Sequence, residues 1–163
     1  MSDGGTSWSQ VRERQIAAMG LTCKILGHIL QNVTDEEARS LRDGRDGWSI
    51  IEIVCHLRDF DQIFHNRARM MLELEHPQLP AYDHEAMAIE REYQGESLGD
   101  AYETLAASRA RFVAFFEALA PAQWARGGVH PERDSFSMTD ALMQVSAHDL
   151  DHLEQITRVM RSR

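Results

Sequence analysis

The stretch Ser146–Leu153 reads SAHDLDHL and places two histidines, His148 and His152, four residues apart. On an α-helix, residues at this spacing lie on the same face, one turn apart. Taking about 100° per residue, the apolar residues on that face are Ala141, Val145, Ile156 and Val159. The two imidazoles therefore lie in the apolar stripe of an amphipathic helix, where their ring nitrogens need partners.

A third histidine has the same setting in an earlier segment. Ser49 and Glu52 form a capping box, which predicts a helix that begins there and runs to about residue 75, before Pro77. The residues on one face of this helix are Ile53, His56, Phe60, Ile63 and Arg67. His56 is thus expected on a core-facing stripe rather than on the solvent side.

Helical periodicity recurs in two further segments, residues 7–33 and residues 97–119. The histidine-bearing helix begins at the capping residues 137–140 and is expected to end near residue 160. Four long helices and no convincing strand predict an all-α fold, a four-helix bundle.

The connections between these helices are long for a bundle. Residues 34–47 are expected to be a polar connection, and residues 77–96 contain only a weak helical patch at 83–93. The second helix is about 37 Å long at 1.5 Å per residue, and a link of about 20 residues can return along that length. The second and third helices can therefore run parallel, joined by a crossover.

Composition narrows the class of protein. The 163 residues suit a single domain, 1–163, with residues 1–6 as a loose leader. The net charge of −9 argues against a nucleic-acid partner, which needs a basic surface. Two cysteines are too few for a disulfide framework, and no apolar run is long enough to cross a membrane. We expect a cytoplasmic protein with no membrane partner.

Two interpretations of the three histidines remain open. Three neutral imidazoles from two facing helices suit a divalent metal ion with positions left for water or substrate. Alternatively, they are core histidines bonded to carbonyls or carboxylates. The zincin signature is absent, because Asp149 follows the first histidine of the pair where that signature has glutamate. The remaining histidines are expected on the surface or in loops: His28, His65, His76, His84 and His130.

Several other residues have a structural and a functional interpretation. Arg67 is expected to pair with an acid inside the bundle, the alternative being a carboxylate of the substrate. Trp48 precedes the helix cap as a hydrophobic staple, and Trp124 either closes a bundle end or lines a pocket mouth. Three aspartates close to the histidines either orient the imidazoles or are solvated or paired with arginines, the latter being the structural interpretation: Asp59, Asp149 and Asp151.

These motifs together resemble a known family. Gly47–Leu57 (GWSIIEIVCHL), followed by Asp59 and Arg67, resembles the second-helix motif of the DinB/YfiT-like superfamily. Trp124–Pro131 and Met138–Ile156 resemble its C-terminal half, with the order and spacing of all three histidines kept. The segment 132–136 lacks the glycine that the family pattern leads us to expect before the fourth helix, a departure that concerns the pocket rim.

The resemblance implies an up-down-down-up bundle in which His56, His148 and His152 bind one divalent metal ion, zinc or nickel. It also implies a homodimer and an enzyme acting on a small-molecule substrate. Characterised relatives are transferases and isomerases that use a low-molecular-weight thiol, which the metal would activate; a hydrolase would activate water at the same position. The alternative is a non-catalytic, stress-linked bundle whose metal is structural.

Overall fold

The computed structural model describes residues 7–162, so the predicted leader, residues 1–6, lies outside the described part. Within that part, four long helices pack together: α1 (Trp8–Leu30), α3 (Ile50–Glu73), α5 (Leu98–Glu117) and α6 (Met138–Met160). Each begins and ends within three residues of its predicted bounds. None of the helices in residues 7–162 is both long and apolar enough to cross a membrane.

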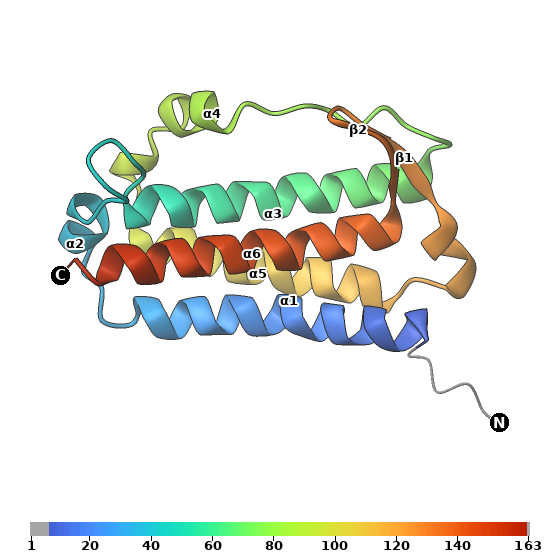
Figure 1. The fold of residues 1–163 in the computed structure, drawn as a ribbon, viewed down its shortest axis with the longest axis horizontal. Coiled ribbons are helices and arrows are strands. Elements are labelled where there is room, and N and C mark those ends of the chain that lie inside the picture. Colours follow the sequence, from blue (N-terminus) through green and yellow to red (C-terminus); the bar gives the residue numbers. More distant parts are fainter. Residues whose placement is uncertain (1–6, 163) are drawn as a thin grey trace.

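The helices run up-down-down-up, as the family resemblance implied (Figure 1). α3 and α5 run in the same direction, and α1 and α6 run opposite to both. α1 packs against α5 and α6, and α3 packs against the same two helices. Because α3 and α5 are parallel, the segment between them returns along the whole bundle, and the predicted crossover is confirmed.

The crossover, residues 74–97, carries the helical patch expected from the sequence. It contains α4 (His84–Glu90) and the 3-10 helix η1 (Tyr93–Gly95). The Tyr93 hydroxyl donates a hydrogen bond of 2.6 Å to the buried carboxylate of Asp59 on α3, and Arg91 donates one of 2.7 Å to the same group. These bonds hold the end of the crossover against the bundle.

Capping boxes begin both helices that carry the histidine triad, as predicted. The Ser49 side chain accepts from the Glu52 amide, and the Glu52 carboxylate accepts from the Ser49 amide. Ser137 and Asp140 make the same reciprocal pair at the start of α6. The start of each helix is therefore fixed by its own sequence, and with it the axial position of each histidine.

Two expectations about the connections are wrong. The predicted polar connection 34–47 contains a short helix, α2 (Asp35–Ser40), that begins at a capping box of Thr34 and Glu37. The segment before α6 contains the 3-10 helix η2 (Pro121–Ala125) and, where no strand was expected, an antiparallel hairpin of β1 (Gly127–His130) and β2 (Arg133–Ser137). The strand sequences GGVH and RDSFS each contain one large apolar residue, so neither shows the alternating apolar pattern that predicts a strand.

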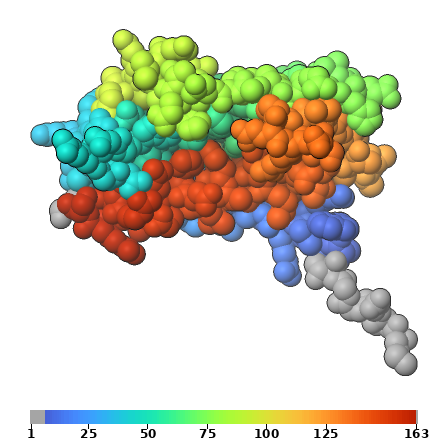
Figure 2. Space-filling model, turned by 45° about the horizontal axis from the view of Figure 1, so that its top comes forward, coloured from blue at the N-terminus to red at the C-terminus, as the bar shows by residue number. Residues whose placement is uncertain are grey.

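The hairpin is stabilised by contacts with a segment distant in sequence. The Val129 amide donates to the Pro77 carbonyl at 2.9 Å, and the Leu79 amide donates to the Val129 carbonyl at 2.9 Å. A Cβ at Gly128 would lie 2.7 Å from the Pro77 oxygen, so only glycine permits this approach. Hairpin and crossover thus lie over the same face of the bundle (Figure 2).

The interior contains apolar clusters and, at the centre of the bundle, a buried ionic network around Arg109. Trp124 stacks on Phe116 with ring centroids 5.7 Å apart, closing the bundle end as the structural interpretation predicted. Arg109 on α5 is 4% exposed and donates to Asp61 on α3 at 2.6 Å and to Asp149 on α6 at 2.5 Å. Its guanidinium therefore joins three helices of the bundle.

We expect Arg109→Met to lower the free energy of unfolding by about 3–5 kcal/mol, because it leaves two buried carboxylates without their cation. Arg69→Met is the matched control, since Arg69 pairs with Glu73 on the surface, where both side chains are more than half exposed. It should change stability by less than about 1 kcal/mol. Urea unfolding measures both; equal effects would show that the network contributes no more than a surface pair.

Candidate metal centre

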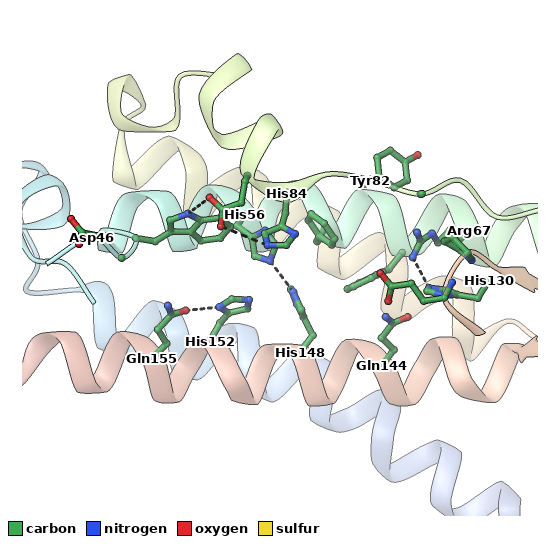
Figure 3. Close-up of a pocket in the computed structure, with 18 residues that line it drawn as sticks. Asp46, His56, Arg67, Tyr82, His84, His130, Gln144, His148, His152 and Gln155 are labelled. Carbon is green, nitrogen blue, oxygen red and sulfur yellow. Dashed lines mark hydrogen bonds and ion pairs between the residues drawn. The ribbon is translucent and has the colours of Figure 1, made fainter. Parts of the chain in front are cut away.

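The structure brings together the three histidines that the sequence singled out. His56 lies on α3, and His148 and His152 lie on the antiparallel α6 (Figure 3). The Nε2 atoms of His56 and His148 are 2.9 Å apart, and one ligand nitrogen from each of the three rings lies within 4.8 Å of the other two. Three nitrogens bound at about 2.1 Å to one tetrahedral ion lie about 3.4 Å apart, so the 2.9 Å pair must open slightly and separations near 4.8 Å must close by about 1.4 Å, a change within reach of side-chain rotation.

The buried ionic network determines which way the histidines on α6 face. Asp149 points into the bundle, where it accepts from Arg109 and from the hydroxyl of Thr22. His148 is the preceding residue, about 100° away around the helix, and therefore faces α3. His152, one turn further on, lies on the same side. The rotation of α6 that satisfies Asp149 thus also turns both imidazoles toward His56.

All three imidazoles are neutral at ordinary pH. Burial, assisted by the neighbouring His148 and His152, lowers the pKa of His56 to about 2. Burial together with His152 lowers the pKa of His148 to about 3, and burial also lowers the pKa of His152. Neutral rings keep a lone pair for a metal ion, so the environment that disfavours imidazolium prepares these side chains as ligands.

One histidine is oriented by a partner that the sequence analysis did not assign. His152 Nδ1 lies 2.8 Å from Oε1 of Gln155, and Gln155 Nε2 donates to Asp43 at 3.0 Å. Because an amide oxygen only accepts, Nδ1 carries the ring proton and Nε2 carries the lone pair. Gln155 lies three residues after His152 on the same helix face, and that spacing was the available signal. His56 Nδ1, in contrast, is buried without a partner.

Of the three aspartates near the histidines, Asp59 and Asp149 are paired with arginines and Asp151 is solvent-exposed, in agreement with the structural interpretation. Asp59 accepts from Arg58 at 2.8 Å and from Tyr93 and Arg91 on the crossover. Burial raises its pKa, but these hydrogen bonds and charges outweigh burial, and the net pKa is lowered. Asp149 is bonded to Arg109, and Asp151 is exposed. None of the three bonds directly to an imidazole of the triad.

The triad lines one part of an open cavity of about 610 Å³. α3 and α6 form its floor, and the crossover and the hairpin form its sides (Figure 3). Trp48 is packed on the core, as the staple prediction required, and its ring also meets His56 edge-on at 4.8 Å. Glu132, from the segment 132–136 that was expected to affect the rim, lines the cavity, as does the preceding Pro131. The site is accessible to a small molecule.

Two further histidines line the same cavity, although the sequence analysis assigned them to surface or loops. His84, at the start of α4, is exposed as expected, but its ring centroid lies 5.9 Å from that of His56. For His130 the expectation is wrong: it is 6% exposed and lies on β1. The strand that buries it was not recognised, so its burial could not be predicted.

The expectation that Arg67 pairs with an acidic residue inside the bundle is also wrong. Its guanidinium donates to the Pro80 carbonyl at 2.5 Å and lies 3.2 Å from Nε2 of His130. No ion pair within 4.0 Å involves Arg67 in residues 7–162. Arg67 contacts the crossover and the hairpin instead of an acidic residue on another helix, because this part of α3 faces those two segments.

Comparisons with known proteins agree with this architecture. The chain is 25% identical over 156 residues to the Bacillus subtilis protein named "Putative metal-dependent hydrolase YfiT", covering 94% of this chain and 83% of that protein. It is 26% identical over 132 residues to "Putative metal-dependent hydrolase OB0413" of Oceanobacillus iheyensis, covering 80% and 75% of the two chains.

Solved structures show the same fold. The Bacillus subtilis YfiT structure, described as a four-helix bundle of unusual topology, superposes with a TM-score of 0.88 at 21% identity, covering 99% of this chain and 92% of that one. A mycothiol-dependent maleylpyruvate isomerase superposes with a TM-score of 0.74 at 14% identity; the match covers 89% of this chain and 60% of the isomerase. Residues 22–156 match the DinB superfamily, to which this chain therefore belongs.

Proposed function

We propose that this protein is a metal-dependent enzyme in which His56, His148 and His152 hold one divalent ion, zinc or nickel. The observation that carries the proposal is the position of the triad, which faces a cavity of about 610 Å³. Within residues 7–162, the cluster around these ligand atoms contains three such residues. Three protein ligands beside an accessible cavity leave a position for an exogenous ligand, whereas a structural site has four.

A divalent ion held by the three imidazoles would supply the Lewis acidity that lowers the pKa of a coordinated thiol or water. We propose a low-molecular-weight thiol, with transfer or isomerisation as the reaction. Asp59 and Asp149, the buried carboxylates nearest the triad in sequence, are engaged by arginines, and the cavity-lining Glu85 accepts a hydrogen bond from the Trp48 indole. Coordination alone can deprotonate a thiol, whereas water activation commonly uses a general base.

The residues of the chain have distinct roles in this proposal. The buried environment keeps the imidazoles neutral, and Gln155 fixes the proton of His152 on Nδ1. Trp48 and Phe60, whose rings contact His56, exclude water from one side of the ligands. The names of the relatives agree with metal dependence and, in one case, with a thiol cofactor.

Metal content tests the ligand set. Protein purified without a histidine tag should bind about one equivalent of zinc or nickel, and His152→Ala should lose it. His28→Ala is the control, because His28 is exposed on α1 and away from the cavity, and it should retain the metal. Elemental analysis after dialysis measures all three proteins. No metal in the parent protein, even after zinc or nickel is added, would leave the triad as core histidines and end the enzyme proposal.

The orienting role of Gln155 gives a second prediction. Gln155→Leu should weaken zinc affinity by about 10–100-fold, because His152 loses the acceptor that fixes its tautomer and ring orientation. Gln144→Leu is matched, since Gln144 lies on the same helix and lines the same cavity without bonding to the triad. Competition with a chromophoric chelator measures both affinities. Equal affinities in the two variants would show that Gln155 does not orient the ligand.

Cobalt substitution separates the thiol, water and non-catalytic alternatives. Cobalt-loaded protein should develop a thiolate-to-cobalt charge-transfer band when N-acetylcysteine is added, because the metal position faces the cavity. The oxygen analogue N-acetylserine should produce no such band. An unchanged spectrum with both would contradict thiol activation; hydrolysis of an activated ester by the zinc form would then favour the hydrolase, and no reactivity would favour a structural metal.

A further inference from the structure

The cavity has a second polar region, formed by Arg67 and His130, away from the triad (Figure 3). Arg67 is 6% exposed and His130 is 6% exposed, yet both side chains line the cavity. Within residues 7–162, no carboxylate lies within ion-pairing distance of the Arg67 guanidinium. A buried cation without a counterion is unfavourable unless something else compensates its charge.

Hydrogen-bond donors outnumber acceptors around this pair. The neutral imidazole of His130 has one lone pair, but two donors approach its ring nitrogens. The Glu132 amide lies 3.2 Å from Nδ1, and the Arg67 guanidinium lies 3.2 Å from Nε2. Whichever nitrogen carries the proton, one of these N–H groups faces another donor. Arg67 Nε is also buried without an acceptor. The region therefore lacks an acceptor, which a bound anion would provide.

The surrounding groups compensate the charge only in part. Arg67 donates to the Pro80 carbonyl, and its guanidinium lies 5.5 Å from the ring centre of Tyr82. Glu132 is the acidic residue that lines this end of the cavity, and it is exposed. Burial lowers the pKa of Arg67 and outweighs the opposite effect of Tyr82 and Glu132. The guanidinium still carries its charge at neutral pH, since its ordinary pKa is far above 7.

We propose that Arg67 and His130 form an anion subsite that binds a carboxylate of the substrate, at the other end of the cavity from the three histidines. One guanidinium offers a planar fork that matches a carboxylate, and one cation with Glu132 nearby suits a single carboxylate group, with one charge, better than a phosphate group with two. This proposal adds a feature of the substrate, a carboxylate, to the proposed function. It rests on the proposed function only for the position of the reacting atom.

The subsite also restricts the length of the substrate. Arg67 follows His56 by eleven residues on α3, so their Cα atoms are about 16 Å apart along the helix axis. The Arg67 side chain leans toward the N-terminus of α3, and therefore toward His56, which shortens the span. A molecule that reaches both ends is thus extended, with its carboxylate remote from the reacting group. A small acid such as a three-carbon mercaptoacid cannot bridge them.

The competing explanation is structural: Arg67 holds the crossover through Pro80 and has no ligand. Both explanations predict a loss of stability when Arg67 is replaced, so stability alone does not separate them. Anion binding does, because it is measured on the unmodified protein.

The test uses metal-free parent protein titrated with glutarate, with the neutral glutaramide and with inorganic phosphate. Nuclear magnetic resonance follows the Arg67 Nε–H signal and the His130 ring signals. We expect glutarate to shift both sets saturably, glutaramide to shift neither, and phosphate to bind more weakly. No shift with glutarate at 100 mM would overturn the subsite, and tighter binding of phosphate would overturn the carboxylate assignment.

Two variants with a matched control sharpen this test. Arg67→Lys keeps a positive charge but loses the fork, and should weaken glutarate binding at least tenfold. Arg133→Lys is the control, because Arg133 is an exposed arginine on the same hairpin, and should bind as the parent does. Glu132→Gln, at an exposed position that does not threaten folding, should strengthen binding two- to fivefold. Unchanged affinity in both Arg67→Lys and Glu132→Gln would overturn the proposal.

Cobalt-loaded protein then tests whether the two ends act on one molecule. 11-Mercaptoundecanoate should bind more tightly than 11-mercaptoundecanol, whereas 3-mercaptopropionate should show no such preference over 3-mercaptopropanol. Arg67→Lys should abolish the preference for the long acid. If no thiol binds cobalt while glutarate still binds the metal-free protein, thiol activation fails and the anion subsite stands. If thiols bind without any preference for a carboxylate, thiol activation stands and the subsite as a substrate contact is overturned.

Discussion

The Arg109 guanidinium is the contact on which the rest of the structure depends. It donates to Asp61 on α3 and Asp149 on α6, and also to the Met19 carbonyl on α1 at 2.8 Å. A buried arginine can be accommodated only where acceptors meet its fork, so the four helices are restricted to the rotations that bring these groups together. One of those rotations turns His148 and His152 toward α3.

The up-down-down-up topology supplies the second requirement of the site, which is a cavity. In a bundle joined by short loops, helix faces are either packed or open to solvent. Here the parallel arrangement of α3 and α5 requires a long return segment, and this segment lies over one face together with the hairpin (Figures 1 and 2). The contacts of Val129 with Pro77 and Leu79 join the two coverings. The resulting space is bounded by four separate parts of the chain.

The cavity contains two groups of polar atoms that lack partners of the opposite kind. At the triad, burial favours neutral imidazoles with lone pairs, which suits a cation; at Arg67 and His130, buried donors lack acceptors, which suits an anion. Each region would be unfavourable in a purely structural core. Their separation along α3 is consistent with a substrate that is held at one end and reacts at the other.

The sequence by itself determined the parts that depend on local interactions. Helical periodicity and the capping boxes at Ser49 and Ser137 predicted the four long helices within three residues, since such signals involve residues three or four apart. The same patterns placed His56, His148 and His152 on core-facing stripes and selected them as candidate ligands. Motif order and spacing were sufficient to recognise the superfamily.

Only the tertiary structure decided the features that depend on contacts between distant segments. The hairpin is stabilised by pairing with residues 77–79, so neither its strands nor the burial of His130 could be predicted from local pattern. Arg67 was assigned an acidic partner because helix periodicity gives the face of a residue but not what lies opposite. The same holds for the bond between Gln155 and Asp43. Local sequence determines the helix face on which a side chain lies, whereas the packing of distant segments determines which group it contacts.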